Sequence, residues 1–207
     1  MLPRLYAIVD AGVVAASGLS FAGYAAELRT AGVRLIQYRD KTGTPQEVLR
    51  GAAVLRAAFA GSGARLVMND RADLAVLAEF DGVHVGHFDL SPEDAKRVVG
   101  GGRIVGVSTH TEDQVRAAEL SCADYIAFGP VFSTGTKLDT EPVVGLEGLR
   151  RVRALTTKPL VAIGGITRLN ARSVIEAGAD SVAVISGLLS RGESVEKVVR
   201  DFIEVLG

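Results

Sequence analysis

Residues 160–186 read LVAIGGITRLNARSVIEAGADSVAVIS and contain one complete strand–helix–strand unit. Leu160–Gly164 and Ser181–Ile185 are short, nearly continuous apolar runs, as expected of strands that are buried on both faces of a parallel sheet. Between them, Thr167–Asn170 predicts the start of a helix, and the glycine of Ala177-Gly178-Ala179 predicts its end. This unit therefore predicts two parallel strands joined by a helix.

The same pattern recurs along the whole chain. The runs predicted as strands are Leu5–Val9, Leu35–Arg39, Arg65–Asn69, Gly82–Val85, Ile104–Val107, Tyr125–Gly129, Leu160–Gly164 and Ser181–Ile185. Segments of helical periodicity lie between them, such as Phe21–Thr30 and Gln46–Phe59, and Ser91-Pro92 is a strong helix start. Eight alternations predict an α/β protein formed by a single (β/α)8 TIM barrel over residues 1–207, at about 26 residues per unit. An open, doubly wound sheet is the alternative fold.

Composition and charge limit the class of function. The 207 residues include 23 basic and 24 acidic side chains and have a net charge of −1, so a broad nucleic-acid-binding surface is not expected. One cysteine, Cys122, excludes an internal disulfide and is expected to be buried and inert, in keeping with a reducing cytoplasm. No uninterrupted apolar stretch is long enough to span a membrane. We expect a cytoplasmic protein with small-molecule substrates and neither nucleic acid nor membrane as partner; a homo-oligomer is compatible with the sequence.

Polar side chains follow the second predicted strand in an alternating pattern. Gln37, Arg39 and Lys41 lie two residues apart, so they project to one side of the strand. In a TIM barrel the active site lies at the carboxyl ends of the strands. An amide and two cations at that position suit a polyanionic ligand, whereas solvated surface charges are the plain alternative.

Two carboxylates follow the next two strands. Asp70 comes directly after Arg65–Asn69, and Asp89 comes shortly after Gly82–Val85. Neighbouring strands are about 4.8 Å apart, so both acids are expected above adjacent strand ends. Magnesium takes one or two carboxylates together with substrate phosphates, which would relieve the repulsion between acids and a polyanion. Helix capping is the alternative role for either aspartate.

A second group of residues predicts a phosphate site. Thr134-Gly135-Thr136-Lys137 combines two hydroxyls and a cation after the sixth strand. Gly164-Gly165 and Ser186-Gly187 follow the seventh and eighth strands, where these barrels recurrently bind phosphate through backbone amides. Ordinary flexible loops and tight turns are the alternatives.

The histidines indicate no acid–base machinery of their own. His84 lies within a predicted strand and is expected to be an interior, satisfied residue. His87 and His110 lie near strand ends, but no spacing to an acid or a nucleophile singles them out.

Taken together, these motifs resemble those of the thiamine-phosphate synthase family. The resemblance covers nearly the whole chain and rests on the order and spacing of several segments. They are Gln37-Tyr38-Arg39-Asp40-Lys41, Asn69-Asp70-Arg71-Ala72-Asp73-Leu74-Ala75, Asp81-Gly82-Val83-His84-Val85-Gly86 with Asp89, Gly106-Val107-Ser108, Ala123-Asp124-Tyr125-Ile126-Ala127-Phe128-Gly129-Pro130-Val131-Phe132, Thr134-Gly135-Thr136-Lys137 and Ala162-Ile163-Gly164-Gly165-Ile166. The chain departs from the family at His87-Phe88, where a glutamine and an acid are usual.

The resemblance implies a magnesium-dependent transferase of thiamine biosynthesis. Such an enzyme joins 4-amino-5-hydroxymethyl-2-methylpyrimidine diphosphate to thiazole phosphate, or to its carboxylated form, and releases thiamine phosphate and pyrophosphate. The implied pyrimidine diphosphate site comprises Gln37, Tyr38, Arg39, Asp40, Lys41, Asn69, Ser108 and Lys137, of which Arg39, Lys41, Ser108 and Lys137 are the catalytic candidates. The implied thiazole phosphate site comprises Thr134, Gly135, Thr136, Gly165, Ile185 and Ser186, and the implied Mg2+ ligands are Asp70 and Asp89.

The implied mechanism is dissociative and needs no protein nucleophile. Pyrophosphate leaves the pyrimidine methylene carbon, the aminopyrimidine stabilises the resulting cation, and the thiazole nitrogen attacks. A related thiazole tautomerase is the main alternative, but it needs a histidine where this chain has Gly129-Pro130. A phosphosugar epimerase or isomerase would need a convergent acid–base pair. A noncatalytic thiamine-phosphate-binding protein would be expected to lack Lys41, Asp70 or Asp89, all of which are present.

Overall fold

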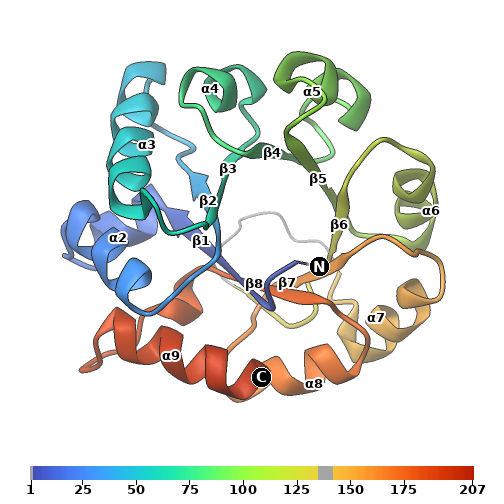
Figure 1. Cartoon of the computed structure of the whole chain (residues 1–207). Coiled ribbons are helices and arrows are strands. Elements are labelled where there is room, and N and C mark those ends of the chain that lie inside the picture. The colour runs from blue at the N-terminus through green and yellow to red at the C-terminus, as the bar shows by residue number, and fades with distance from the viewer. Residues whose placement is uncertain (1, 135–141) are drawn as a thin grey trace.

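The chain forms a closed barrel of parallel strands surrounded by helices (Figure 1). The computed structural model describes residues 2–134 and 142–207. Its strands are β1 (Leu5–Asp10), β2 (Leu35–Arg39), β3 (Arg65–Asn69), β4 (Gly82–Val85), β5 (Ile104–Thr109), β6 (Tyr125–Phe128), β7 (Leu160–Ile163) and β8 (Ser181–Val184). Each strand pairs with the next in parallel, and β1 also pairs with β8, with Leu5 opposite Val182. This last pairing closes the sheet and decides for the TIM barrel against an open sheet.

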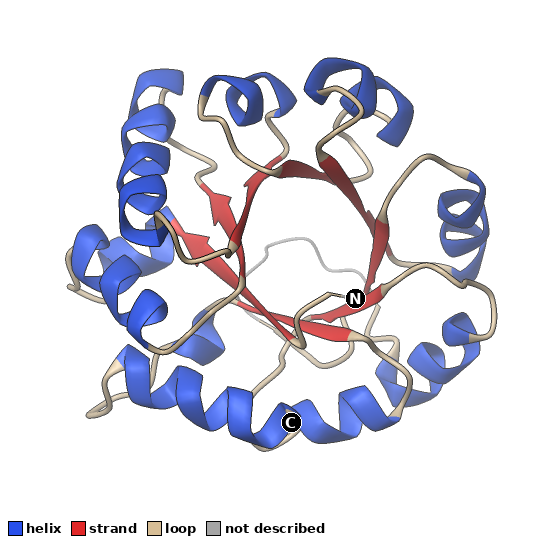
Figure 2. Cartoon of the chain, viewed as in Figure 1, coloured by secondary structure: helices blue, strands red, loops and turns tan. Residues whose placement is uncertain are grey.

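Helices form the outer layer, and Figure 2 shows them ringing the strands on all sides. They are α1 (Ala11–Ala16), α2 (Phe21–Thr30), α3 (Pro45–Phe59), α4 (Ala72–Leu77), α5 (Pro92–Val99), α6 (Glu112–Leu120), α7 (Gly145–Arg153), α8 (Ala171–Glu176) and α9 (Val195–Leu206), with a short 3-10 helix, η1 (Ser186–Leu188), after β8. Among the described residues, no helix is both long and apolar enough to cross a membrane.

Local sequence signals set the helix starts. The Thr44 side chain accepts a bond from the Glu47 backbone N–H while the Glu47 carboxylate bonds back, a capping box just before Pro45. Ser91 caps α5 in the same way, by accepting from the Asp94 backbone N–H. The predicted strands agree with the observed ones to within two residues at each end. Helix α1, which Asp10 caps at Val13, was not predicted.

The core has two layers because side chains alternate along each strand. The larger outer layer fills the space between sheet and helices and includes Ile36, Tyr38 and Met68. The inner layer fills the barrel itself and consists of Tyr6, Ile8, Leu35, Val67, Tyr125, Ala127, Val161 and Ala183, with Leu2 packed against it. The barrel is therefore a solid platform, and ligands must bind at its end rather than pass through it.

Candidate active site

Two adjoining cavities open at the carboxyl ends of the strands. We name the first the β2–β5 cavity, about 460 Å³, for the strands that supply most of its polar side chains. The second, the β6–β8 cavity, is about 480 Å³ and is enclosed by the segments that follow β6, β7 and β8. His110, Ile163, Ala183 and Ile185 line both cavities, so the two form one composite site.

Strand alternation brings the predicted polar residues into the β2–β5 cavity. Those that line it are Gln37, Arg39, Lys41, Asn69, Asp70, Asp89 and Ser108. They come from β2 to β5 and the loops just beyond, so the separate sequence signals meet in one place. The inner-core residues Tyr6 and Ile8 line the same cavity, so the site rests directly on the barrel core.

Each cation of this cavity has a carboxylate partner. The Arg39 guanidinium donates to Asp10, whose other oxygen caps α1 by accepting from Val13 at 3.0 Å. Asp10 is only 6% exposed and lines neither cavity, so it holds Arg39 without itself facing a ligand there. Lys41 donates to Asp70. A polyanion entering this cavity would meet two charges already held in position, one of them on a half-exposed side chain.

Asp70 and Asp89 lie against each other. Burial raises the pKa of Asp70 above its ordinary value, the bond from Lys41 lowers it, and the adjacent Asp89 carboxylate raises it again. The Asp70 backbone is left-handed, with φ of 61°, and its N–H donates to the His84 carbonyl at 2.7 Å. Two adjacent carboxylates beside a single lysine carry excess negative charge. A bound divalent cation would neutralise that excess.

The donor set suits magnesium better than a closed protein-made metal centre. Within residues 2–134 and 142–207, no three His, Cys, Asp or Glu side chains gather as a metal site. Magnesium commonly takes one or two carboxylates and completes its shell with water and substrate phosphates. Asp70 and Asp89 fit that role if the other ligands come from a bound diphosphate.

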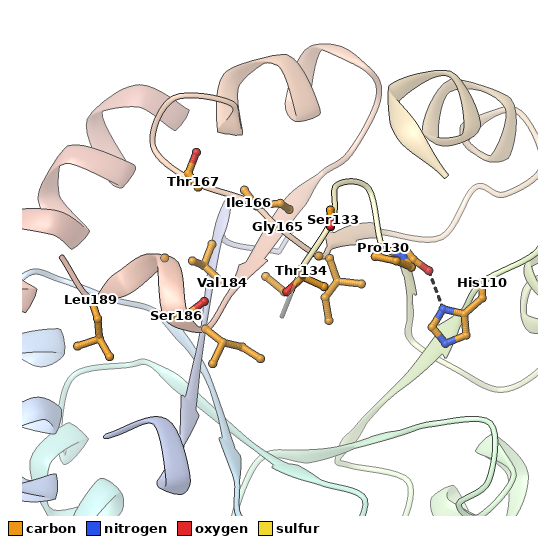
Figure 3. Close-up of a pocket in the computed structure, with 16 residues that line it drawn as sticks. His110, Pro130, Ser133, Thr134, Gly165, Ile166, Thr167, Val184, Ser186 and Leu189 are labelled. Atoms are coloured by element: carbon orange, nitrogen blue, oxygen red, sulfur yellow. Dashed lines mark hydrogen bonds between the residues drawn. The ribbon is translucent and has the colours of Figure 1, made fainter. Parts of the chain in front are cut away.

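Loops carrying glycine shape the β6–β8 cavity. Of the residues predicted for it, Thr134, Gly165, Ile185 and Ser186 line the wall, and Figure 3 shows three of them on separate loops around one space. Gly165 has φ of 63°, and a Cβ there would lie 2.5 Å from the Ser133 carbonyl oxygen. Glycine is therefore required so that the loop carrying Thr134 can pack against the end of β7.

His110 is a site residue that the sequence did not single out. It lines both cavities, and its Nδ1 bonds to the Gly129 carbonyl at 2.6 Å, as the dashed line in Figure 3 shows. A carbonyl only accepts, so Nδ1 carries a proton. The sequence places His110 one residue past the end of β5, which could have marked it as a site residue. That position alone does not predict the contact with Gly129.

The structure places Tyr38, Asp40 and Cys122 differently from the prediction, and three further predicted residues are not described. Tyr38 is an outward-facing residue of β2, packed edge-on against Phe21 at 5.5 Å between ring centroids, and does not line either cavity. Asp40 is also absent from the lining; it accepts bonds from the Thr42 and Gly43 backbone instead. Cys122 is exposed, not buried, because it lies in the turn that follows α6. Gly135, Thr136 and Lys137 lie outside the described residues.

Comparison with known proteins agrees with the fold and shows the family. The barrel and its two-part cavity at the carboxyl ends of the strands define a TIM barrel of the enzyme type. The family model for thiamine monophosphate synthase matches residues 5–188, and the chain belongs to that family.

Relatives and a solved structure match over nearly the full length. A thiamine-phosphate synthase of Koribacter versatilis is 55% identical over 190 residues, which cover 91% of this chain and 90% of that protein. One from Methanocella arvoryzae is 41% identical and covers 98% and 94%. The structure of a thiamine phosphate pyrophosphorylase from Pyrococcus furiosus has a TM-score of 0.86 at 31% identity, covering 99% of this chain and 95% of that one.

Proposed function

We propose that the protein is a magnesium-dependent transferase that makes thiamine phosphate. Its substrates are 4-amino-5-hydroxymethyl-2-methylpyrimidine diphosphate and thiazole phosphate or its carboxylated form, and its products are thiamine phosphate and pyrophosphate. One observation carries the proposal within this family. Residues predicted for two different anionic substrates line two cavities that share a wall.

The β2–β5 cavity is proposed to bind the pyrimidine diphosphate. Arg39 and Lys41 supply positive charge, and Gln37, Asn69 and Ser108 supply amide and hydroxyl groups. Lys137, which the sequence places after Thr134 to Thr136, is proposed to add a third cation. Charge-assisted bonds from such groups hold phosphate oxygens more strongly than neutral bonds do.

The β6–β8 cavity is proposed to bind the thiazole phosphate. Thr134 and Ser186 offer hydroxyls, and the segment around Gly165 offers backbone close to the ligand. Thr136 and Gly135 are proposed to complete this site from the same loop. The shared wall then sets the two organic rings side by side, because Ile163, Ala183 and Ile185 present apolar surface to both cavities.

The reaction exchanges one bond for another at a single carbon. The bond between the pyrimidine methylene carbon and the diphosphate oxygen breaks, and its electron pair leaves with pyrophosphate. The lone pair of the thiazole nitrogen then forms the new carbon–nitrogen bond. The protein's part is to neutralise charge on the leaving group through Arg39, Lys41 and Lys137, to exclude water and to align the rings.

Asp70 and Asp89 are proposed to hold the magnesium ion together with diphosphate oxygens. When bound, the ion would supply positive charge to the departing pyrophosphate. With the ion bound, Asp70 would share its charge between the ion and Lys41, which would leave the Lys41 ammonium available to the diphosphate.

The test is product formation from purified protein. The protein is incubated with both substrates and magnesium, and thiamine phosphate and pyrophosphate are quantified separately. We expect equal amounts of the two products, none when either substrate is omitted, and loss of activity on chelation that added magnesium restores. Absence of thiamine phosphate under these conditions would refute the proposed activity, and undiminished turnover after chelation would refute the metal assignment.

A further inference from the structure

A chain of hydrogen bonds crosses the barrel interior beneath the β2–β5 cavity. The Gln37 amide nitrogen donates to the Tyr6 phenol oxygen at 2.9 Å, and the phenols of Tyr6 and Tyr125 are 2.9 Å apart. The Tyr125 phenol lies 2.9 Å from Nδ1 of His84, and Nε2 of His84 lies 2.8 Å from the Ser108 hydroxyl oxygen. The chain thus joins two cavity-lining residues, Gln37 and Ser108, through the inner core.

The hydrogen bonds of this network have one consistent donor-to-acceptor direction, which starts at the Gln37 amide. With the Gln37 amide donating to Tyr6, the Tyr6 proton goes to the Tyr125 oxygen. Reversing that second bond would leave the Tyr6 proton without an acceptor among the described residues, at a cost that buried hydroxyls rarely bear. The Tyr125 proton then goes to Nδ1 of His84.

The same donor-to-acceptor direction continues from His84 to Ser108, which lines the β2–β5 cavity. A neutral imidazole that accepts at Nδ1 carries its proton on Nε2, so His84 donates to the Ser108 oxygen. A serine hydroxyl has one proton, and here that proton is not needed for the bond to His84. It is available to a group bound in the cavity.

Burial and ring packing keep the phenols of Tyr6 and Tyr125 protonated and fixed in this hydrogen-bond network. Tyr6 and Tyr125 are each 1% exposed, and burial raises the pKa of both phenols far above the ordinary value, so neither loses its proton near neutrality. The Tyr125 ring stacks on His84 and meets Tyr6 edge-on. Gly106 makes room for it, since a Cβ there would lie 2.0 Å from the Tyr125 ring carbon Cζ.

We propose that Tyr6, Tyr125 and His84 are positioning residues that hold Ser108 as a hydrogen-bond donor toward a phosphate oxygen in the β2–β5 cavity. Ionised phosphate oxygens only accept hydrogen bonds, so a fixed donor favours them over any ligand group that must itself donate. The inference rests on the proposed function in that it takes the diphosphate to bind in this cavity. It extends the site beyond the side chains that touch the ligand, into the barrel core.

The first test measures the direction itself and does not depend on activity. Nitrogen NMR of the full protein, with His84 assigned from a His84→Gln variant, reports which ring nitrogen carries the proton. We expect the neutral Nε2–H form in wild type and a mixture of forms in Tyr125→Phe. A neutral Nδ1–H form in wild type would overturn the proposal, because Ser108 would then donate to His84 and not to the ligand.

The second test measures coupling to Ser108, with inorganic pyrophosphate as the probe. Tyr125→Phe should weaken pyrophosphate binding about tenfold, as expected for one lost hydrogen bond to a charged group. Ser108→Ala should have a similar effect, and the double variant should lose little more than either single variant. Tyr24→Phe, which changes a tyrosine of the outer core, is the matched control and should bind as wild type does.

The outcomes separate this inference from the proposed function. Fully additive losses, or unchanged binding in Tyr125→Phe with intact folding, would overturn the positioning role whatever reaction the protein catalyses. In the synthase assay, Tyr125→Phe should raise the KM for the pyrimidine diphosphate and leave the KM for thiazole phosphate near its wild-type value. An equal rise in both would indicate a general structural defect and would also contradict the inference.

Discussion

At the scale of single residues, charge pairing organises the site. The alternation along β2 predicted Arg39 and Lys41 as neighbours but gave no sign of their partners. Asp10 comes from the end of β1, 29 positions away along the chain, and the parallel pairing of β1 with β2 sets it opposite Arg39. The pair holds the guanidinium in place before any ligand arrives, and preorganised charge of this kind lowers a reaction barrier most effectively.

Replacing Arg39 by alanine should slow the chemical step. We expect Arg39→Ala to lower kcat by about a hundredfold, which corresponds to about 3 kcal/mol of lost transition-state stabilisation. The KM for thiazole phosphate should change little. Steady-state kinetics with each substrate varied in turn measures this, with Arg50→Ala on the exposed face of α3 as the control. A change confined to thiazole phosphate would contradict the assignment.

A separate prediction concerns the carboxylates of Asp70 and Asp89. Asp70→Asn and Asp89→Asn should each reduce turnover by about a hundredfold or more and raise the magnesium concentration needed for half-maximal activity. Asparagine suits the left-handed backbone at position 70 as aspartate does, so the fold should survive the first change. Magnesium titrations of both variants, beside circular dichroism spectra, supply the measurement. Variants with wild-type magnesium dependence would exclude these residues as ligands.

At the scale of elements, strands were easier to predict than side-chain placement. The apolar runs were long enough and regular enough to give every strand to within two residues. Tyr38 was placed in the site only by the family resemblance, whereas strand alternation puts it on the face of β2 opposite to Gln37 and Arg39, where the structure has it. Helix α1 was missed since its sequence, Ala11–Ala16, has no charged side chain and contains a glycine.

Gly106 of β5 offers a test of inner-core packing. A methyl group at this position would strike the Tyr125 ring, so Gly106→Ala should destabilise the protein by about 1–3 kcal/mol, the usual cost of overpacking. Gly101→Ala is the matched control, because a Cβ there meets nothing within 4 Å. Urea denaturation of both variants gives the difference. Equal stability of the two would show that the phenol is not fixed against β5.

Glu119 of α6 makes the stability depend on pH. The Thr156 hydroxyl is the main cause that lowers the pKa of Glu119 to about 2, and Thr157 adds two further bonds. The carboxylate therefore stabilises the fold above the unfolded-state pKa of about 4.5, and that contribution falls as pH drops toward 2. Glu119→Gln should be less stable than wild type at pH 7, with a smaller difference at pH 3. Denaturation at both pH values checks this, and a gap that widens in acid would contradict it.

At the scale of the whole molecule, the barrel brings polar residues that are dispersed along the sequence together in one composite site. The sequence predicted which loops carry polar residues, and strand order predicted that they meet. It could not predict that the two cavities share a wall at His110 and Ile185, nor the hydrogen-bonded path through Tyr6 and Tyr125. Both features depend on side-chain packing across the closed barrel; Tyr6 and Tyr125, for example, are 119 positions apart in the sequence.

Each cavity is proposed to receive its own substrate, and separate titrations of the two ligands distinguish the cavities. Pyrimidine diphosphate and thiazole phosphate are each titrated calorimetrically into wild type, Arg39→Ala and Ser186→Ala. We expect a crossed pattern: Arg39→Ala weakens pyrimidine diphosphate binding about tenfold or more and spares thiazole phosphate, and Ser186→Ala does the reverse. If instead either variant lost affinity for both ligands equally, or each lost the ligand assigned to the other cavity, the two-cavity account would be wrong.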